Sequence, residues 1–319
     1  MRRLVILLAL IALGAIAWEF RVELERKLPP WFFGGSPHQQ YARELRRQYL
    51  DATAAGSAWL AAADDALRNP PLRRQLFGLE GAFNTDPVVS WRFPVRRGQR
   101  IVIDVSSHEK PVFVDLFEAD DLDRIASAPL NATRLEFEAD EDEELIARVQ
   151  AGAYPREAFA IAQRAEATLE FPVQDVTPRA VGGLFGDGRD RGGRRHEGID
   201  IFAPRRTPVV AAIDGVVSPQ TTNNLGGNVV WIWSIGRGIS LYYAHLDEHA
   251  VSPGDRVAAG EVIGYVGTSG NARGTPPHLH FGVYARPGGA VDPLPYVCDA
   301  PCGERLMQRQ PQPRNGRDS

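Results

Sequence analysis

Four of the seven histidines in this 319-residue chain lie in three short segments near the C-terminus. The segments are His196-Glu-Gly-Ile-Asp200, Tyr243-Ala-His-Leu246 and His278-Leu-His280. Imidazoles combined with one carboxylate suit a catalytic zinc site, whereas structural zinc sites usually have four ligands and are rich in cysteine. The two cysteines of the chain lie outside these segments. A fold that uses this chemistry must bring three distant segments together.

The segment around His278 has the pattern of a β-strand. It continues into Phe281-Gly-Val-Tyr284, where apolar residues alternate with smaller ones. Residues two apart on a strand point to the same face and lie about 6.6 Å apart. Both imidazoles of His278 and His280 are therefore expected to face one cavity, with Leu279 on the opposite side, and only one of them needs to bind a metal.

The segment from His196 to Asp200 differs from the helical metalloprotease motif His-Glu-x-x-His. Gly198 and the preceding Gly192-Gly193 favour a loop that enters a strand over residues 199–202. Because position 200 is an aspartate, the second histidine of that motif is absent, and Glu197 loses its usual role as the base.

Taken together, residues 171–297 resemble the lysostaphin-type (LytM-domain) zinc endopeptidases, which cut peptide cross-bridges in bacterial cell walls. The resemblance covers about two fifths of the chain. The matching segments are Leu184–Gly186, Arg195–Ile201, Pro208–Val217, Tyr243–Leu246, Gly260–Gly270 and Pro277–Phe281.

The resemblance implies that His196, Asp200 and His280 bind one Zn²⁺ per chain and that His245 and His278 form a catalytic pair. Three protein ligands leave a fourth position for water, whose pKa zinc lowers to about 7. One free histidine would take the proton of the water and return it to the leaving amine, and the other would hydrogen-bond the developing oxyanion. The sequence does not assign these two roles, although His278, beside His280, is the preferred base.

The fold class is expected to be mainly β. Residues 173–297 should form the zinc peptidase domain, a small antiparallel β-sandwich or barrel-like domain, because short β-branched and aromatic runs alternate with Gly and Pro. Asp247 to His249 is interpreted as a polar turn. Residues 186–195 and 271–277 are expected to form loops at the rim of the groove, and the arginines of the first loop are interpreted as solvated charge rather than substrate contacts. The expected strands are Val209–Val217, Asn228–Ser234, Gly238–His245 and Glu261–Val266.

The N-terminal half is expected to contain a helical segment at residues 36–80 and a smaller accessory β-sandwich at residues 86–172. His38 to Arg68 has apolar residues at spacings of three and four and is followed by Asn69-Pro70-Pro71, which predicts one helix. His38 and His108 are isolated and expected to be exposed. Spacing, wall binding and covering of the groove all remain open as roles of the sandwich.

The two ends of the chain carry other signals. Arg2-Arg3 precede fifteen residues that are apolar or glycine, so residues 1–20 are expected to be a signal peptide or an N-terminal membrane anchor. This predicts export to the periplasm or cell envelope, with possible inner-membrane association. Cys298 and Cys302 are expected to form a disulfide there, and residues 305–319 to be disordered. A net charge of −4 gives no reason to expect a nucleic-acid partner.

The predicted function is therefore that of an exported zinc metalloendopeptidase that hydrolyses peptide stems or cross-bridges of peptidoglycan. One alternative is a catalytically restrained regulator of other cell-wall hydrolases, because some members of the family that this chain resembles lose the ligands. A second alternative is hydrolysis of a different exported polypeptide by the same chemistry. The sequence does not identify the bond that is cut.

Overall fold

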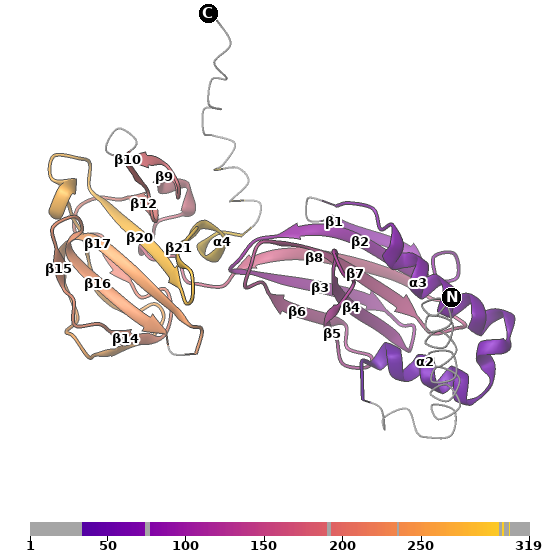
Figure 1. The fold of residues 1–319 in the computed structure, drawn as a ribbon. Helices are drawn as coiled ribbons and strands as arrows, with labels where there is room; N and C mark the ends of the chain where they lie inside the picture. The colour runs from indigo at the N-terminus through magenta and orange to yellow at the C-terminus, as the bar shows by residue number, and fades with distance from the viewer. Residues whose placement is uncertain are drawn as a thin grey trace, which may run out of the picture. The chain divides into compact units, whose positions relative to one another are not determined.

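The computed structural model describes residues 34–73, 77–189, 193–234, 236–299, 302 and 306, which fall into two compact units (Figure 1). The C-terminal unit begins at Ala165 and includes Arg96–Arg100 and Glu138–Glu141. The predicted signal or anchor at residues 1–20, and all of the predicted tail at 305–319 except Leu306, lie outside the described residues. Among the described residues, no helix combines the length and apolar character needed to cross a bilayer.

Two four-stranded sheets form the N-terminal unit. Strand β1 lies inside the segment predicted to be helical, so that prediction was wrong from residue 77 onward. Two glycines in the six residues of β1 disfavour a helix there. One sheet has the order β1 (Phe77–Ala82), β8 (Ala158–Ala167), β3 (Gln99–Ser107), β6 (Arg134–Glu138), and the other β2 (Val88–Val95), β7 (Glu143–Ala151), β4 (Val112–Glu118), β5 (Arg124–Ser127).

The predicted single helix is two helices, α2 (Pro37–Arg47) and α3 (Ala54–Arg68), separated by the short 3₁₀ helix η2 (Leu50–Ala52). Tyr49 has a left-handed backbone with φ of 59°, and the Thr53 hydroxyl accepts a hydrogen bond from the Gly56 amide to begin α3. The apolar periodicity continues across the break, so it did not indicate where the chain turns.

Both helices pack on the sheets of this unit, and His38 is buried rather than exposed. Its ring stacks on Trp59 at 4.6 Å, and its Nε2 lies 2.7 Å from Oε1 of Gln150 in β7. The expectation of an exposed His38 failed because a histidine on the apolar face of a helix can pair with a buried polar residue of the sheet. His108 is exposed, as expected.

An eleven-stranded sheet dominates the C-terminal unit. Its path ends at β18 and β9 without closing, so the barrel-like alternative was wrong. The main order is β18 (Arg256–Val257), β14 (Gly215–Val217), β16 (Gly227–Ser234), β17 (Ile239–His249), β20 (His278–Ala285), β12 (Ile199–Phe202) and β9 (Val181–Gly183). Attached to this path are β13 (Pro208–Val210), β15 (Thr222–Asn223), β19 (Val262–Val266) and β21 (Gly289–Val291).

Smaller elements complete the unit: the 3₁₀ helices η3 (Pro178–Ala180) and η5 (Gly270–Ala272), the two-stranded hairpin of β10 (Gly188–Arg189) and β11 (Arg194–Arg195), and α4 (Leu294–Val297). The expected disulfide joins Cys298 and Cys302 just after α4.

One predicted strand and one predicted turn need correction. The run from Val209 to Val217 forms two strands, β13 and β14, which pair with different neighbouring strands. The predicted turn at Asp247–His249 is instead the end of β17, which pairs with β20 up to Ala244 and with β19 from Leu246. Polar side chains at this end of β17 concealed the strand, because the pattern reports exposure rather than backbone pairing.

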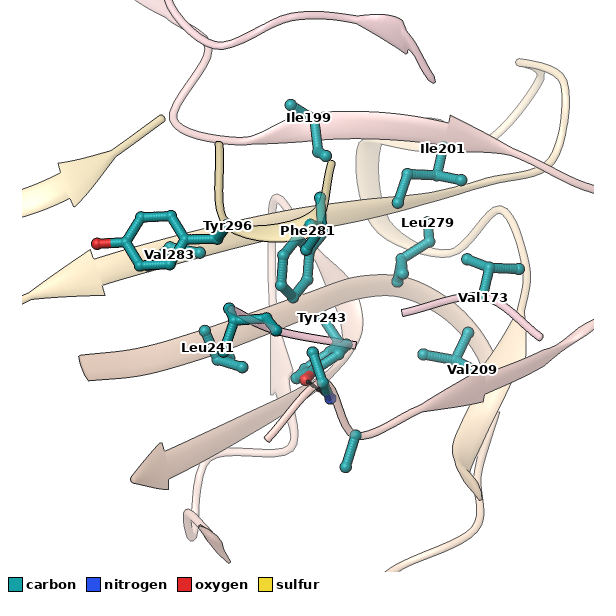
Figure 2. Close-up of a cluster of buried hydrophobic side chains, with 14 of the residues drawn as sticks. Val173, Ile199, Ile201, Val209, Leu241, Tyr243, Leu279, Phe281, Val283 and Tyr296 are labelled. Carbon is teal, nitrogen blue, oxygen red and sulfur yellow. Dashed lines mark hydrogen bonds between the residues drawn. The ribbon is translucent and has the colours of Figure 1, made fainter. Parts of the chain in front are cut away.

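The core of this unit lies against one face of β12, β17 and β20 (Figure 2). Ile199 and Ile201 of β12 and Leu279 and Phe281 of β20 are fully buried there, together with Tyr243 of β17. Because successive strand residues point to opposite faces, the residues between them are turned to the other side of the sheet. That side holds the candidate site.

Candidate functional site

The strand register places the candidate metal ligands next to one another. Asp200 in β12 lies directly opposite His280 in β20. Their neighbours Ile199 and Leu279 point into the core, so the packing of the core determines that Asp200 and His280 share the other face. Two residues 80 positions apart in the chain thereby become neighbours.

Three ligand atoms converge at this point. Nε2 of His196 lies 2.9 Å from Nδ1 of His280 and 3.0 Å from Oδ1 of Asp200, and the last two atoms are 3.2 Å apart. Among the described residues, these three form the one group of ligand-type side chains with metal-site spacing.

The donor set fits a zinc ion. Ligand atoms about 2.0–2.1 Å from a tetrahedral zinc lie about 3.4 Å from one another, close to the separations found between these atoms. Unprotonated imidazole nitrogens and a carboxylate oxygen that point at one another repel, and a cation between them removes this repulsion.

His196 is oriented from behind its ring. Nδ1 lies 2.8 Å from the carbonyl oxygen of Leu184 and 3.0 Å from Nη2 of Arg189, and a proton on Nδ1 that is donated to the carbonyl oxygen would leave Nε2 free to bind a metal. Gly198, two residues on, is needed for the close approach of β12 and β20. A Cβ at that position would lie 2.4 Å from the carbonyl oxygen of Phe281 and 2.8 Å from the ring of His280.

The charge states follow from burial and from the neighbours. Burial by itself would raise the pKa of Asp200, but hydrogen bonds and charge from His196 and His280 in their protonated forms outweigh it and lower that pKa. A cation held in place of those protons would also favour the ionised carboxylate. Burial also lowers the pKa of His280, which favours its neutral, ligating form.

His245 and His278 lie beside the three ligands. Their ring centroids are 5.0 Å apart, and that of His245 is 5.9 Å from that of His280. Nδ1 of His245 lies 3.0 Å from the carbonyl oxygen of Ser269, and Nδ1 of His278 lies 2.9 Å from that of Pro276. We assign the protons to these Nδ1 atoms, so each neutral ring has an unprotonated Nε2.

The backbone of His245 marks the point where β17 exchanges β20 for β19. Its φ is 64°, in the left-handed region that few residues other than glycine adopt, and its amide donates to the carbonyl oxygen of Gly226 at 2.7 Å. Burial lowers the pKa of His245 to about 4, with smaller contributions from His278 and His280. A residue in this backbone conformation beside a candidate metal site is typical of a functional position.

The structure adds one polar residue that the sequence did not identify. Nη2 of Arg189, in the β10–β11 hairpin, lies 2.5 Å from Oδ2 of Asp200. No signal in the sequence separates Arg189 from the three other arginines at positions 191, 194 and 195. The interpretation of this arginine as solvated loop charge was wrong.

Two further residues are excluded from the site. Glu197 is exposed and accepts a hydrogen bond from the Tyr284 hydroxyl at 3.2 Å. His249 is held by its backbone partner, with Nε2 3.1 Å from the carbonyl oxygen of Val229.

Phe202 does lie at the site. Its ring centroid is 5.2 Å from that of His278, and its side chain is partly exposed.

The segment that holds the site is similar to known proteins. Residues 194–293 match Peptidase family M23. The L-Ala–D-Glu endopeptidase of Bacillus subtilis is 40% identical over 142 residues, which are 40% of this chain and 42% of that protein. The DD-carboxypeptidase/endopeptidase Mpg of Neisseria meningitidis is 44% identical over 88 residues, 28% of this chain and 20% of that protein. The chain thus spans less than half the length of either curated relative.

Among solved structures, the catalytic domain of lysostaphin from Staphylococcus simulans has 29% sequence identity to this chain and a TM-score of 0.32. The match covers 41% of this chain and 91% of that one.

Proposed function

Because the C-terminal part of this chain is a lysostaphin-type Peptidase family M23 domain, we propose that the protein is a zinc-dependent endopeptidase that hydrolyses peptide cross-links of peptidoglycan. One observation carries the proposal: three ligand atoms from His196, Asp200 and His280 converge within 3.2 Å of one another. Two further histidines lie beside them.

The three ligands would bind the ion through Nε2 of His196, Oδ1 of Asp200 and Nδ1 of His280. A zinc ion at this point supplies Lewis acidity, which polarises a carbonyl group and lowers the pKa of water to about 7. The side chains supply the remaining chemistry.

His245 and His278 would move the protons. As water adds to the scissile carbonyl carbon, an unprotonated Nε2 accepts a proton from it, and the C–N bond breaks as the leaving amine receives that proton. The other imidazole can donate a hydrogen bond to the oxygen that gains negative charge only after its Nε2 has taken a proton from solvent, which the lowered pKa of His245 opposes. Because both Nδ1 atoms are engaged by backbone carbonyls, each ring acts through Nε2. His278 remains our preferred base.

The substrate class rests on the relatives. The two curated relatives are named for an L-Ala–D-Glu bond and for D,D bonds, so the relatives do not share one target bond. We therefore propose a peptidoglycan peptide as the substrate, and digestion of defined muropeptides followed by mass measurement of the products would identify the bond. A different exported polypeptide as the substrate predicts that none of these muropeptides is cut.

We further propose that the protein works outside the cytoplasm, in the periplasm or cell envelope. Its proposed substrate lies there, and disulfides such as Cys298–Cys302 persist in oxidising compartments. Fractionation of cells that express the tagged protein tests the location, and recovery in the cytoplasmic fraction would contradict it. Mass measurement of the mature N-terminus separates a cleaved signal from an anchor.

The alternative of a non-enzymatic regulator is not favoured. All five site residues are present and adjacent, and the relatives above carry the names of enzymes. A regulator predicts that the purified protein leaves murein intact while it stimulates another hydrolase.

The decisive experiment is digestion of purified murein together with a measurement of zinc content. We expect the wild-type protein to bind about one zinc per chain and to release peptides. The His280→Ala protein should neither bind zinc nor release peptides, because only two of the three ligands remain. His249→Ala is the matched control, since that histidine of the same unit bonds to the backbone outside the site. A wild-type protein that stays free of metal after reconstitution with zinc would overturn the proposal.

A further inference from the structure

The contact between Arg189 and Asp200 uses one of the two carboxylate oxygens. Nη2 of Arg189 lies 2.5 Å from Oδ2 and 3.0 Å from Nδ1 of His196, whereas Oδ1 faces Nε2 of His196 at 3.0 Å and Nδ1 of His280 at 3.2 Å. The two oxygens thus have separate partners. A carboxylate held in this way offers one oxygen to the metal position.

Gly183 preserves the space that this pair needs. It lies opposite Asp200 on the neighbouring strand β9. A Cβ at residue 183 would lie 2.5 Å from Oδ2 of Asp200 and 2.8 Å from Nη2 of Arg189. A side chain here would therefore displace the ion pair.

The backbone around Arg189 holds it against the site. The His196 amide donates to the carbonyl oxygen of Asp187, and the Gly186 amide donates to that of His196, each at 2.8 Å. The hairpin strand β10 then pairs Arg189 with Arg194. The side chain is one-third exposed, which distinguishes it from a freely solvated arginine.

We infer that Arg189 is a positioning residue of the metal site: its guanidinium holds Oδ2 of Asp200, so that Oδ1 alone points at the position between His196 and His280. The inference rests on the proposed function. Partners that hold a ligand from behind typically change metal affinity 10- to 100-fold when they are removed.

An effect of charge and an effect of positioning predict opposite changes in zinc affinity when Arg189 is replaced. A positive charge beside a ligand weakens the binding of a dication, so an effect of charge alone predicts that Arg189→Met binds zinc more tightly. Positioning predicts weaker binding, by roughly 10- to 100-fold. Arg189→Lys keeps the charge but loses the planar fork of donors, and it should also bind zinc more weakly than the wild type.

The experiment measures zinc dissociation constants by competition with a chromophoric chelator, and absorption spectra of the cobalt(II) forms. We expect Arg189→Met and Gly183→Ala to weaken zinc binding by at least tenfold and to alter the cobalt spectrum. Arg195→Met is the matched control, because it removes a charge from the same hairpin, where among the described residues the side chain hydrogen-bonds to the Gly186 carbonyl oxygen at 3.0 Å. It should match the wild type.

Unchanged or tighter zinc binding in Arg189→Met and Arg189→Lys, with an unchanged cobalt spectrum, would overturn the inference. Circular dichroism of the metal-free variants checks that they fold. If Gly183→Ala does not fold, the two Arg189 variants decide the outcome, since Arg189 is one-third exposed and Met and Lys have side chains of similar length. A wild-type protein that binds no zinc would instead refute the proposed function.

Discussion

His245 and His278 have the same hydrogen-bonding pattern on different backbones. Each directs Nδ1 at a carbonyl oxygen, but His278 begins strand β20 and His245 has a left-handed backbone. A residue in this conformation costs about 1–3 kcal/mol and persists only where the surroundings hold it. Here the bond from the His245 amide to Gly226 and the two-sided pairing of β17 hold it. The site therefore depends on the strain at one residue.

Loss of either histidine should reduce turnover without loss of the metal. We expect His245→Ala and His278→Ala each to lower the rate of peptide release by roughly 10²- to 10⁴-fold, the usual contribution of a positioned acid or base. Zinc content, measured by elemental analysis, should stay at the wild-type level because neither side chain is a proposed ligand. A variant that lost its zinc in proportion to its activity would show that the residue is a ligand instead.

The family resemblance picked out five polar residues that the fold brings together, and their roles remain predictions. Alternation by itself placed only His278 and His280 on one face. Arg189 could not be placed, since its position depends on a hairpin whose two-residue strands have no distinctive pattern. His38 was misjudged for a related reason, because its buried partner Gln150 comes from a strand 112 residues away.

At the scale of elements, the site depends on how closely β12 and β20 approach. Gly198 immediately precedes β12, where the backbone of Phe281 and the ring of His280 leave no space for a side chain. The sequence indicated strands here, but the long strand β17 and its change of partner were missed. Alternation of apolar residues reports one buried face, and it does not report which strand is the neighbour.

Gly198→Ala should therefore damage both stability and the metal site. The added Cβ must push β12 away from β20, and we expect a loss of about 1–3 kcal/mol in the free energy of unfolding, the range for a strained or overpacked position. Zinc affinity should fall with it, because Asp200 and His280 lie on the separated strands. Chemical denaturation of the metal-free protein measures the first effect.

Gly236→Ala is the control for that experiment, since a Cβ at this position meets no atom of the described residues within 4 Å. It should unfold like the wild type. Equal stability of Gly198→Ala and Gly236→Ala would mean that the strands adjust to the added methyl group, contrary to the expectation.

At the scale of the whole molecule, the N-terminal unit has its own buried polar network. His38 lies against Trp59 and Gln150, and in the same unit the Arg148 guanidinium is paired with Asp115 at 2.8 Å. Burial, assisted by Arg148 and opposed by Asp115, lowers the pKa of His38 from 6.5 to about 4. The neutral ring is thus part of how helix α2 is held on the sheet.

This network predicts an acid-sensitive N-terminal unit. Between pH 6.5 and 4 the unfolded chain binds a proton that the folded unit excludes, so stability falls as the pH falls through this window and the loss ends near pH 4. The full effect is about 3 kcal/mol at about 1.4 kcal/mol per pKa unit. Calorimetric unfolding at about pH 7.5, 6, 5 and 4 measures this loss of stability.

His38→Gln removes the titrating group but keeps a hydrogen-bonding side chain, so its melting temperature should depend less on pH over that range. His108→Gln, at an exposed position, should retain the wild-type dependence. Parallel pH profiles for all three proteins would assign the acid sensitivity to other groups.

The alternation along β12 and β20 also limits how such a domain can diversify. Inserting or deleting one residue in either strand would exchange its two faces, sending carboxylate and imidazole into the hydrocarbon interior and aliphatic groups into solvent. Length changes are therefore tolerable only in the connecting loops. Attempts to redirect this scaffold to a new bond should graft loops and leave both strands untouched.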